Sequence, residues 1–142
     1  MNSTATPRPT EPLNVTKKLR AYGITPTQQR IRIGEVLFHE AQHVSADQVL
    51  QMVNKNEELV SKATVYNTLG LFAKKGLINE VIIEPNKLFY DTNLNKHYHL
   101  YHVDSGVLED ISSDQVKIQQ LPELPSGTVL EDIDVIIRLR EQ

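Results

Sequence analysis

The sequence predicts an α+β fold in two parts, a helical half that ends in a β-hairpin and a smaller half rich in strands. Two apolar periodic runs begin with helix-start signals, in which Ser or Thr is followed three residues later by Gln. After residue 76 the apolar period changes from that of a helix to that of strands. The charge changes too: residues 1–90 hold eleven Lys and Arg against eight Asp and Glu, whereas residues 91–142 hold four against ten.

Composition limits the class of protein. The chain has 142 residues, of which 39% are hydrophobic and 23% charged, as is usual for a soluble globular protein. No run approaches the roughly 20 apolar residues of a membrane span, and residues 1–13 lack the apolar core of a secretory signal. We therefore expect a cytoplasmic protein with no membrane partner. The absence of cysteine excludes disulfides and thiolate metal sites.

The N-terminal part of the chain is expected to hold a tail and two helices. Residues 1–13 are rich in Pro, Thr and Ser and are expected to form a disordered tail. A short helix follows over residues 14–21. Thr25 as N-cap and Pro26 as the first helical residue, with Gln at the third helical position, predict a second helix that runs to about His39.

Two further helices are expected to form a helix-turn-helix. A capping box at Ser45 begins a third helix that ends near Lys55. After a short connection, residues 61–76 form a fourth helix, with Ser61 as its N-cap and Gly76 just beyond its end. A helix, a short connection and a second helix leave the latter able to lie in a DNA groove.

The helix at residues 61–76 has two distinct faces. Val65, Leu69 and Phe72 lie at helical spacing on one buried stripe. The opposite face combines small, polar and basic residues: Ala63, Tyr66, Asn67, Gly70 and Lys74. Small residues allow close approach, Tyr and Asn can contact base edges, and Lys can contact a phosphate. The candidate DNA-binding residues are Lys62, Ala63, Thr64, Tyr66, Asn67 and Lys74. The alternative is an ordinary amphipathic helix with a mixed outer face.

Residues 77–91 contain two β-prone runs around a turn at Pro85-Asn86. A hairpin directly after a recognition helix is a wing, so residues 14–91 are predicted to form a winged-helix DNA-binding domain. Residues 92–96 are polar and are expected to act as a hinge.

Residues 97–142 are predicted to form a small α/β dimerisation domain. Two strands surround a turn at Ser105-Gly106, a short helix covers residues 113–121, and a final strand runs through residues 127–140. Such a small domain has little core of its own, so we expect dimerisation to stabilise it.

Histidines and aspartates gather near the boundary between the two halves. His97 and His99 are two apart in a predicted strand, so their side chains lie on the same side. Asp91 ends the wing, Asp110 closes the paired strand, and His43 directly precedes the third helix. Imidazoles and carboxylates together favour zinc, iron(II) or manganese(II). If His43 joined the cluster, one ion would bridge both halves. The alternative is a pair of surface histidines in a polar strand.

The remaining histidines leave other readings open. His39 has no partner evident from sequence and is expected on a helix surface. His102 has the opposite strand parity and could face the core, the dimer interface or a second ligand. Three His ligands with an open position could also activate water in a hydrolytic metalloenzyme. No candidate base is placed by motif, so we expect a protein that is not an enzyme.

From about Leu19 to Asp110 the chain resembles the ferric uptake regulator family. The resemblance is carried by four runs: Gly23-Ile24-Thr25-Pro26-Thr27-Gln28-Gln29-Arg30, His43-Val44-Ser45-Ala46, Ala63-Thr64-Val65-Tyr66-Asn67-Thr68-Leu69, and His97-x-His99 with Gly106. It implies a homodimeric, metal-responsive transcriptional regulator. Such a regulator would bind a palindromic double-stranded operator, act as a repressor and control iron homeostasis genes.

The resemblance also implies a ligand set. The family's regulatory metal site maps onto three imidazoles and two carboxylates: His43, Asp91, His97, His99 and Asp110. It implies one divalent metal per subunit, iron, manganese or zinc, and makes residues 97–142 a metal-sensing domain as well as a dimerisation domain. Tyr66 matches the family's base-contacting tyrosine, and Asn67 stands where the family commonly has Arg.

The chain departs from the family pattern at two other metal sites. His102 and Ser105 occupy the positions of a C-x-x-C zinc site, and a further site would need Lys96, Tyr98 and Lys117, which are poor or impossible ligands. Cysteine-poor members that have D-T-N after the wing and an R-L-R end resemble the iron response regulator branch, which is associated with haem or iron status. The candidate haem-linked residues are His97, His99 and His102. The peroxide-sensing branch uses the same three His and two Asp and is the alternative, although it normally keeps the cysteine zinc site.

Overall fold

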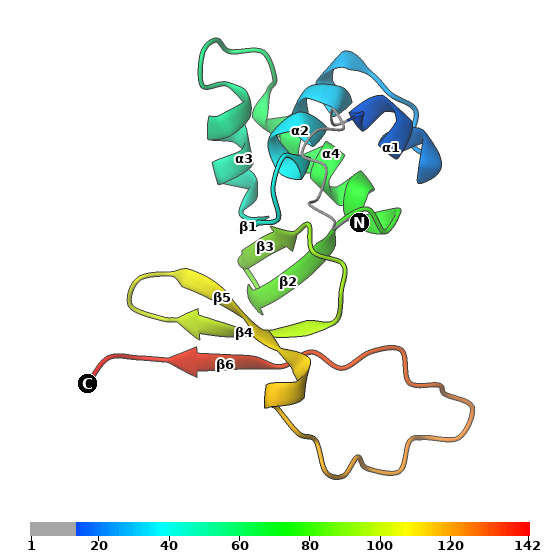
Figure 1. The fold of residues 1–142 in the computed structure, drawn as a ribbon, viewed down its shortest axis with the longest axis vertical. Helices are drawn as coiled ribbons and strands as arrows, with labels where there is room; N and C mark the ends of the chain where they lie inside the picture. The colour runs from blue at the N-terminus through cyan, green and yellow to red at the C-terminus, as the bar shows by residue number, and fades with distance from the viewer. Residues whose placement is uncertain (1–13) are drawn as a thin grey trace, which may run out of the picture. The chain divides into compact units, whose positions relative to one another are not determined.

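A computed structural model describes residues 14–142, which form two compact units, one up to Leu94 and one from Asn95 to Gln142. The tail expected at residues 1–13 lies outside the described residues. The predicted α+β fold class is confirmed, with a winged helix-turn-helix unit first and a small unit of strands after it (Figure 1). No helix in the described residues is long and apolar enough to cross a membrane.

The first unit is built on four helices. They are α1 (Val15–Ala21), α2 (Gln28–Phe38), α3 (Ala46–Val53) and α4 (Lys62–Lys74). Their apolar faces meet in one core, in which Leu19, Ile33, Val49, Leu69 and Phe72 are completely buried. Burial of one such side chain stabilises the fold by about 1.5–3 kcal/mol. The core therefore holds α4 in place while its other face stays exposed.

The predicted start of α2 is wrong by two residues. Thr27, not Thr25, is the N-cap, because the Thr27 hydroxyl accepts the backbone N–H of Arg30 at 3.2 Å. The Thr25 carbonyl instead accepts a hydrogen bond from the Arg30 guanidinium at 2.8 Å. Pro26 precedes the cap and disfavours a helical conformation at Thr25. The helix ends at Phe38, with His39 as its C-cap.

The capping box predicted at Ser45 is confirmed. Ser45 accepts the N–H of Gln48 at 3.2 Å, and the Gln48 side chain accepts the N–H of Ser45 at 2.8 Å. The helix it begins, α3, ends at Val53, two residues before the predicted end. Asn54 ends it and organises the following loop, since its side-chain oxygen accepts the N–H groups of Leu59 and Val60.

The predictions for α4 are confirmed at both ends and along its buried stripe. Ser61 caps its start by accepting the N–H of Thr64 at 3.1 Å. Gly76 follows its end with a φ of 84°, a left-handed conformation that glycine adopts readily. Val65 is completely buried, as predicted, together with the Leu69 and Phe72 side chains of the same stripe.

A three-stranded antiparallel sheet completes the first unit. Its strands are β1 (His43–Val44), β2 (Asn79–Glu84) and β3 (Lys87–Asp91), in the order β1-β3-β2. The predicted hairpin around Pro85-Asn86 is confirmed as β2 and β3. The strand β1 was not predicted; its two residues pair with the end of β3.

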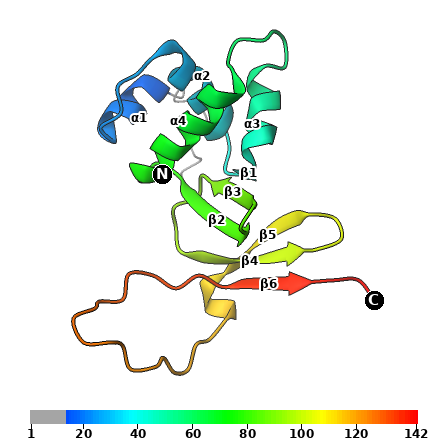
Figure 2. The same cartoon turned by 180° about the vertical axis from the view of Figure 1, so that it is seen from behind.

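The second unit is a three-stranded sheet of order β5-β4-β6. Its strands are β4 (His97–His102), β5 (Val107–Ser112) and β6 (Ile136–Leu139) (Figure 2). The hairpin of β4 and β5 is confirmed, and Gly106 in its turn has a φ of 75°. The last strand, β6, lies parallel to β4. Tyr98, Tyr101 and Leu108 are buried.

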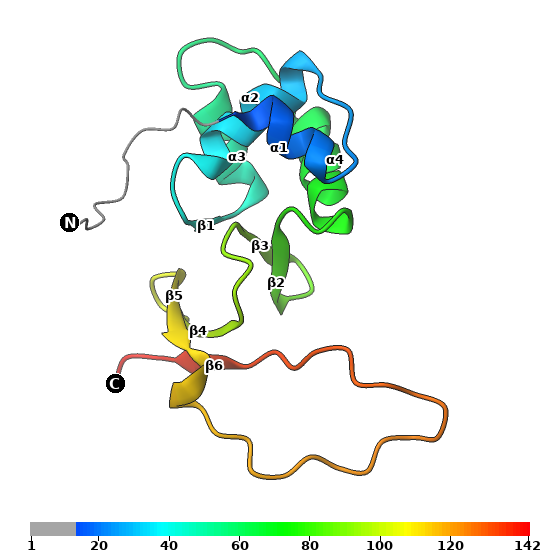
Figure 3. The same ribbon diagram turned by 45° about the vertical axis from the view of Figure 1, so that its right-hand side comes forward.

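The helix predicted over residues 113–121 is wrong. Only a 3-10 turn, η1 (Ser113–Gln115), forms there, and no helix or strand lies between Val116 and Val135 (Figure 3). Two prolines in this segment each remove a backbone donor, which disfavours helix. The predicted final strand at residues 127–140 is also too long, since only β6 is formed.

Candidate DNA-binding face and metal centre

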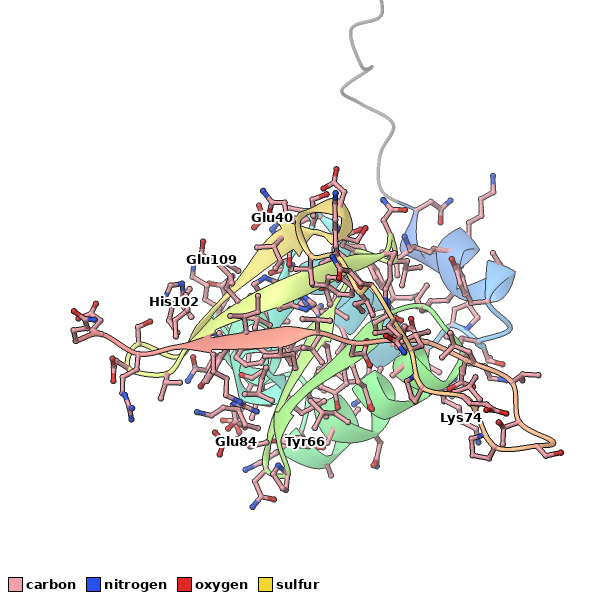
Figure 4. All side chains as sticks on the ribbon, turned by 90° about the horizontal axis from the view of Figure 1, so that it is seen from below. Glu40, Tyr66, Lys74, Glu84, His102 and Glu109 are labelled. Carbon is pink, nitrogen blue, oxygen red and sulfur yellow. The ribbon has the colours of Figure 1, made fainter. Side chains whose placement is uncertain are left out.

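The outer face of α4 carries the candidate DNA-binding side chains. Ala63, Tyr66, Asn67, Gly70 and Lys74 are all exposed, and so is the neighbouring Lys62. Figure 4 shows Tyr66 and Lys74 projecting from this helix. Gly70 leaves open space, because a Cβ built on it would meet nothing within 4 Å. The face thus combines hydrogen-bonding side chains, a cation and a position where another surface can come close.

Thr64 differs from the other candidates on α4. It is half-buried, and its hydroxyl accepts a hydrogen bond from the Ser61 hydroxyl at 2.9 Å. The Ser61 oxygen in turn accepts the Thr64 N–H. The structure therefore places the Thr64 hydroxyl in the N-cap of α4, where it stabilises the start of the helix.

Tyr66 is held by residues that the sequence analysis did not connect with it. Its hydroxyl donates a hydrogen bond to Oδ1 of Asp47 on α3, at 2.8 Å. This bond raises the pKa of the Tyr66 phenol above its ordinary value, with smaller contributions from desolvation and the Asp47 charge. The ammonium of Lys62 lies 5.6 Å from the centre of the Tyr66 ring, within the range of a cation–π contact.

In the second unit, three potential metal ligands converge on one face of the β4–β5 hairpin. Nε2 of His97 and Nε2 of His99 each lie 3.4 Å from Oδ1 of Asp110. His99 and Asp110 are register partners on β4 and β5, and His97 lies two residues before His99 on the same face. Each residue offers one ligand atom, and these three atoms lie within 4.8 Å of one another.

The surroundings of this trio suit a divalent metal. Nδ1 of His97 contacts the carbonyl oxygen of Asn95, and a carbonyl can only accept, so Nδ1 is the donor; in the neutral ring Nε2 then offers its lone pair to a metal. In metal-binding histidines, the ring nitrogen that does not bind the metal commonly donates a hydrogen bond of this kind, which orients the imidazole. The side chains of His97 and His99 are 11% and 8% exposed, whereas Asp110 is 44% exposed. Two imidazoles and a carboxylate fit zinc, iron(II) or manganese(II).

The other two predicted ligands belong to the first unit and lie side by side in its sheet. His43 of β1 is the register partner of Asp91 at the end of β3. Asp91 is only 1% exposed, and its Oδ1 accepts the N–H of Asn93 at 2.9 Å. The His43 ring makes an edge contact with Phe89, with 6.5 Å between ring centres. Cross-strand pairing, which spacing along the chain does not reveal, brings this pair together.

The remaining histidines have other partners. His102 contacts Glu109 through Nε2, and the two side chains extend from neighbouring strands (Figure 4). His39 lies on the helix surface, as expected, where its Nδ1 is 3.1 Å from the Val36 carbonyl oxygen. Its Nε2 is 3.9 Å from the Glu40 carboxylate.

Lys96 stands at a position where many family members have a metal ligand, but here its side chain makes structural contacts. The Lys96 ammonium binds Oδ1 of Asp132 at 2.7 Å and contacts the Ile133 carbonyl. It also lies 5.1 Å from the centre of the Tyr98 ring. The Val135 carbonyl also accepts the N–H of His99 at 3.2 Å. Together these contacts attach the returning chain, residues 132–135 just before β6, to Lys96 and β4.

Comparison with known proteins identifies a single family. The profile of the ferric uptake regulator family matches residues 21–138. The peroxide-responsive repressor PerR of Staphylococcus epidermidis is 30% identical over 104 residues, which cover 72% of this chain and 69% of that protein.

Two solved structures show the same fold. The ferric uptake regulator from Pseudomonas aeruginosa with manganese matches 89% of this chain and 97% of its own, with a TM-score of 0.69 and 23% identity. The ferric uptake regulator from Francisella tularensis with iron matches 84% and 93%, with a TM-score of 0.72 and 23% identity.

Proposed function

This chain belongs to the ferric uptake regulator family, and on that premise we propose that it represses iron homeostasis genes by binding a palindromic operator as a homodimer. Membership makes it a metal-responsive transcription regulator rather than an enzyme, so the hydrolytic alternative is set aside. The observation that carries the proposal is the exposed face of α4, where Tyr66, Asn67 and Lys74 surround the open position at Gly70. A DNA target also indicates a cytoplasmic protein.

The proposed regulatory site combines the donor trio of the second unit with the buried pair of the first. We propose that one divalent ion per subunit, iron, manganese or zinc, is held by His43, Asp91, His97, His99 and Asp110. Six peptide units separate Asp91 from His97, so even a fully extended chain limits their Cα atoms to about 22 Å apart. A bound ion would supply positive charge for the two carboxylates and bonds that favour one arrangement of the hinge at residues 92–96.

This arrangement gives the residues a regulatory task. In a dimer the two α4 helices must lie about 34–36 Å apart to read neighbouring half-sites. His43 and Asp91 are fixed to the same sheet as the wing, and that sheet follows α4 directly. A metal ion bound by His43 and Asp91 would therefore favour one position of the wing and α4, which would move together, relative to the second unit. Linkage between two such sites is typically about 1–3 kcal/mol, which is about 5- to 150-fold in DNA affinity.

We further propose that the physiological effector is iron or haem, as in the iron response regulator branch. The lack of cysteine and the histidine-rich strand β4 support this assignment. The haem candidates are His97, His99 and His102, of which His102 would have to leave Glu109. The second candidate is a peroxide-responsive repressor, and it is favoured by the 30% identity to a repressor of that kind.

A DNA-binding titration at one fixed salt concentration tests the proposal. The protein is compared without metal, with manganese, with iron(II) and with haem, and elemental analysis follows its metal content. We expect one ligand to change DNA affinity at least fivefold, and His97→Ala to abolish the change. His39→Ala is the matched control, since His39 is exposed and distant in sequence from the trio.

The outcomes separate the candidates. Equal DNA affinity in every ligand state would reject the regulatory site and leave a constitutive DNA-binding protein. Loss of metal in His39→Ala as well as in His97→Ala would reject the assigned ligands. Addition of hydrogen peroxide to the iron(II) and manganese forms then tests the second candidate. Release of DNA from the iron form alone would favour peroxide sensing over iron or haem sensing.

A further inference from the structure

Two helices of the first unit meet at the exposed face through one hydrogen bond. Asp47 is the second residue of α3, and Tyr66 lies 19 residues later on α4. Their side chains are exposed, and the phenol oxygen is 2.8 Å from Oδ1 of Asp47. A carboxylate on the face that approaches DNA is unfavourable for phosphate binding. Asp47 therefore does not serve to strengthen sequence-independent binding to the DNA backbone.

The chemistry of this bond fixes what Tyr66 can offer to a partner. A phenolic hydroxyl has a single hydrogen to donate, and an ionised carboxylate can only accept hydrogen bonds. The Tyr66 hydrogen is therefore committed to Asp47, and its oxygen is left as an acceptor. Asp47 lies in the first turn of α3, which fixes its backbone on this helix. The Lys62 ammonium lies 5.6 Å from the centre of the Tyr66 ring, within the range of a cation–π contact.

The major groove distinguishes acceptors from donors. Adenine and cytosine present an amino group there, at N6 and N4, whereas guanine and thymine present the oxygen acceptors O6 and O4. An acceptor-only phenol can bind the amino groups and is repelled by the oxygens. A phenol with a hydrogen to donate can bind either class. The state of one hydrogen atom thus determines which bases are accepted.

We propose that Asp47 is a positioning residue that sets the base preference of α4, by holding Tyr66 as an acceptor for the amino group of adenine or cytosine. This inference rests on the proposed function, since it requires that α4 reads the major groove. It assigns to Asp47 a role in specificity that is separate from affinity. A single hydrogen bond to a base edge corresponds to about a fivefold preference.

The test is selection of binding sites from a randomised duplex library with the full-length protein, in the ligand state that binds DNA most tightly. Selected duplexes are then measured by fluorescence anisotropy at one salt concentration. For the wild type we expect a position in each half-site at which adenine or cytosine is preferred about fivefold. Tyr66→Phe removes the acceptor and is expected to lose that preference.

Three variants separate the hydrogen bond from the charge. Asp47→Ala releases the phenol hydrogen, so the preference at that position is expected to fall toward equal use of all four bases. Asp47→Asn removes the charge but keeps an oxygen acceptor, so the preference is expected to remain. Glu57→Ala removes a charge from the exposed loop after α3, and should raise affinity slightly with the preference unchanged. Thermal unfolding of each variant checks that it is folded during the assay.

Two results would overturn the inference. The first is an unchanged preference in Asp47→Ala, which would make Asp47 a source of general repulsion only. The second is loss of the preference in Asp47→Asn with the fold intact. In either case the wild type still selects a sequence, so the proposed function stands. If the wild type selects no sequence in any ligand state, the proposed function fails together with this inference.

Discussion

Gly70 lies in the interior of α4, on its exposed face, and replacing it with alanine gives two opposite expectations. In the protein alone, Ala is favoured over Gly in a helix interior by about 1 kcal/mol. The added Cβ would meet nothing within 4 Å, so no steric cost offsets this gain. Gly70→Ala is therefore expected to raise the free energy of unfolding by about 1 kcal/mol, and Tm by roughly 4–8 °C for a unit of this size.

Gly34 in α2 provides the matched control. It has the same helical backbone, but an added Cβ would lie 2.5 Å from Cγ1 of the buried Val15. A β-branched side chain has little freedom to move away, and overpacking typically costs about 1–3 kcal/mol. Gly34→Ala should thus be neutral or destabilising, although its gain in helix propensity is equal to that at Gly70.

Urea denaturation followed by circular dichroism measures both variants, and an unchanged m-value confirms that only stability has changed. With DNA the order should reverse, because a methyl group at Gly70 would obstruct close approach to the groove. Gly70→Ala is expected to bind the selected operator more weakly at matched salt. If DNA-free Gly70→Ala were less stable than the wild type, the space around Gly70 would not be open. Greater stability with unaltered DNA affinity would refute the assignment of the α4 face.

Local contacts in both units can be tested by single substitutions. Thr27→Ala should destabilise the protein by about 1 kcal/mol, as measured by denaturation, and Thr25→Ala should cost less because its side chain is not the cap. Asn54→Ala should cost about 1–3 kcal/mol, since it leaves the N–H of the buried Val60 without its acceptor. The Lys96 ammonium lowers the pKa of Asp132 below 3.8, and Asp132 raises the pKa of Lys96 above 10.5. Their contact therefore stabilises the returning chain at neutral pH, and is lost as the pH falls through the lowered pKa of Asp132 or rises through the raised pKa of Lys96. In Lys96→Met, an NMR titration should show the pKa of Asp132 rising back toward its ordinary value.

The elements that the sequence predicts correctly depend on local interactions. The capping box at Ser45 and the end of α4 at Gly76 each involve residues a few positions apart. The buried stripe of α4 follows from helical periodicity, and the two hairpins follow from turn residues between β-prone runs. The facing of His97 and His99 to one side also follows from strand period alone.

The features that were missed depend on contacts between distant residues or on competing local choices. The two-residue strand β1 exists only because β3 pairs with it, and this pairing puts His43 opposite Asp91. The bond from Tyr66 to Asp47 joins two helices and has no pattern in the sequence. The N-cap of α2 was misplaced because two threonines flank one proline. The helix expected over residues 113–121 fails since prolines follow it closely.

The β4–β5 hairpin also bears on how the protein folds. Its loop is short, and closure of a hairpin takes on the order of 1–10 μs. His97, His99 and Asp110 would therefore come together early, from one local event. The pairing of β6 with β4 must instead close the long segment after Ser112, which carries a larger entropic cost. If these residues are the proposed metal ligands, a nascent chain that has emerged only to the end of β5 would already hold three of them together, before synthesis is complete.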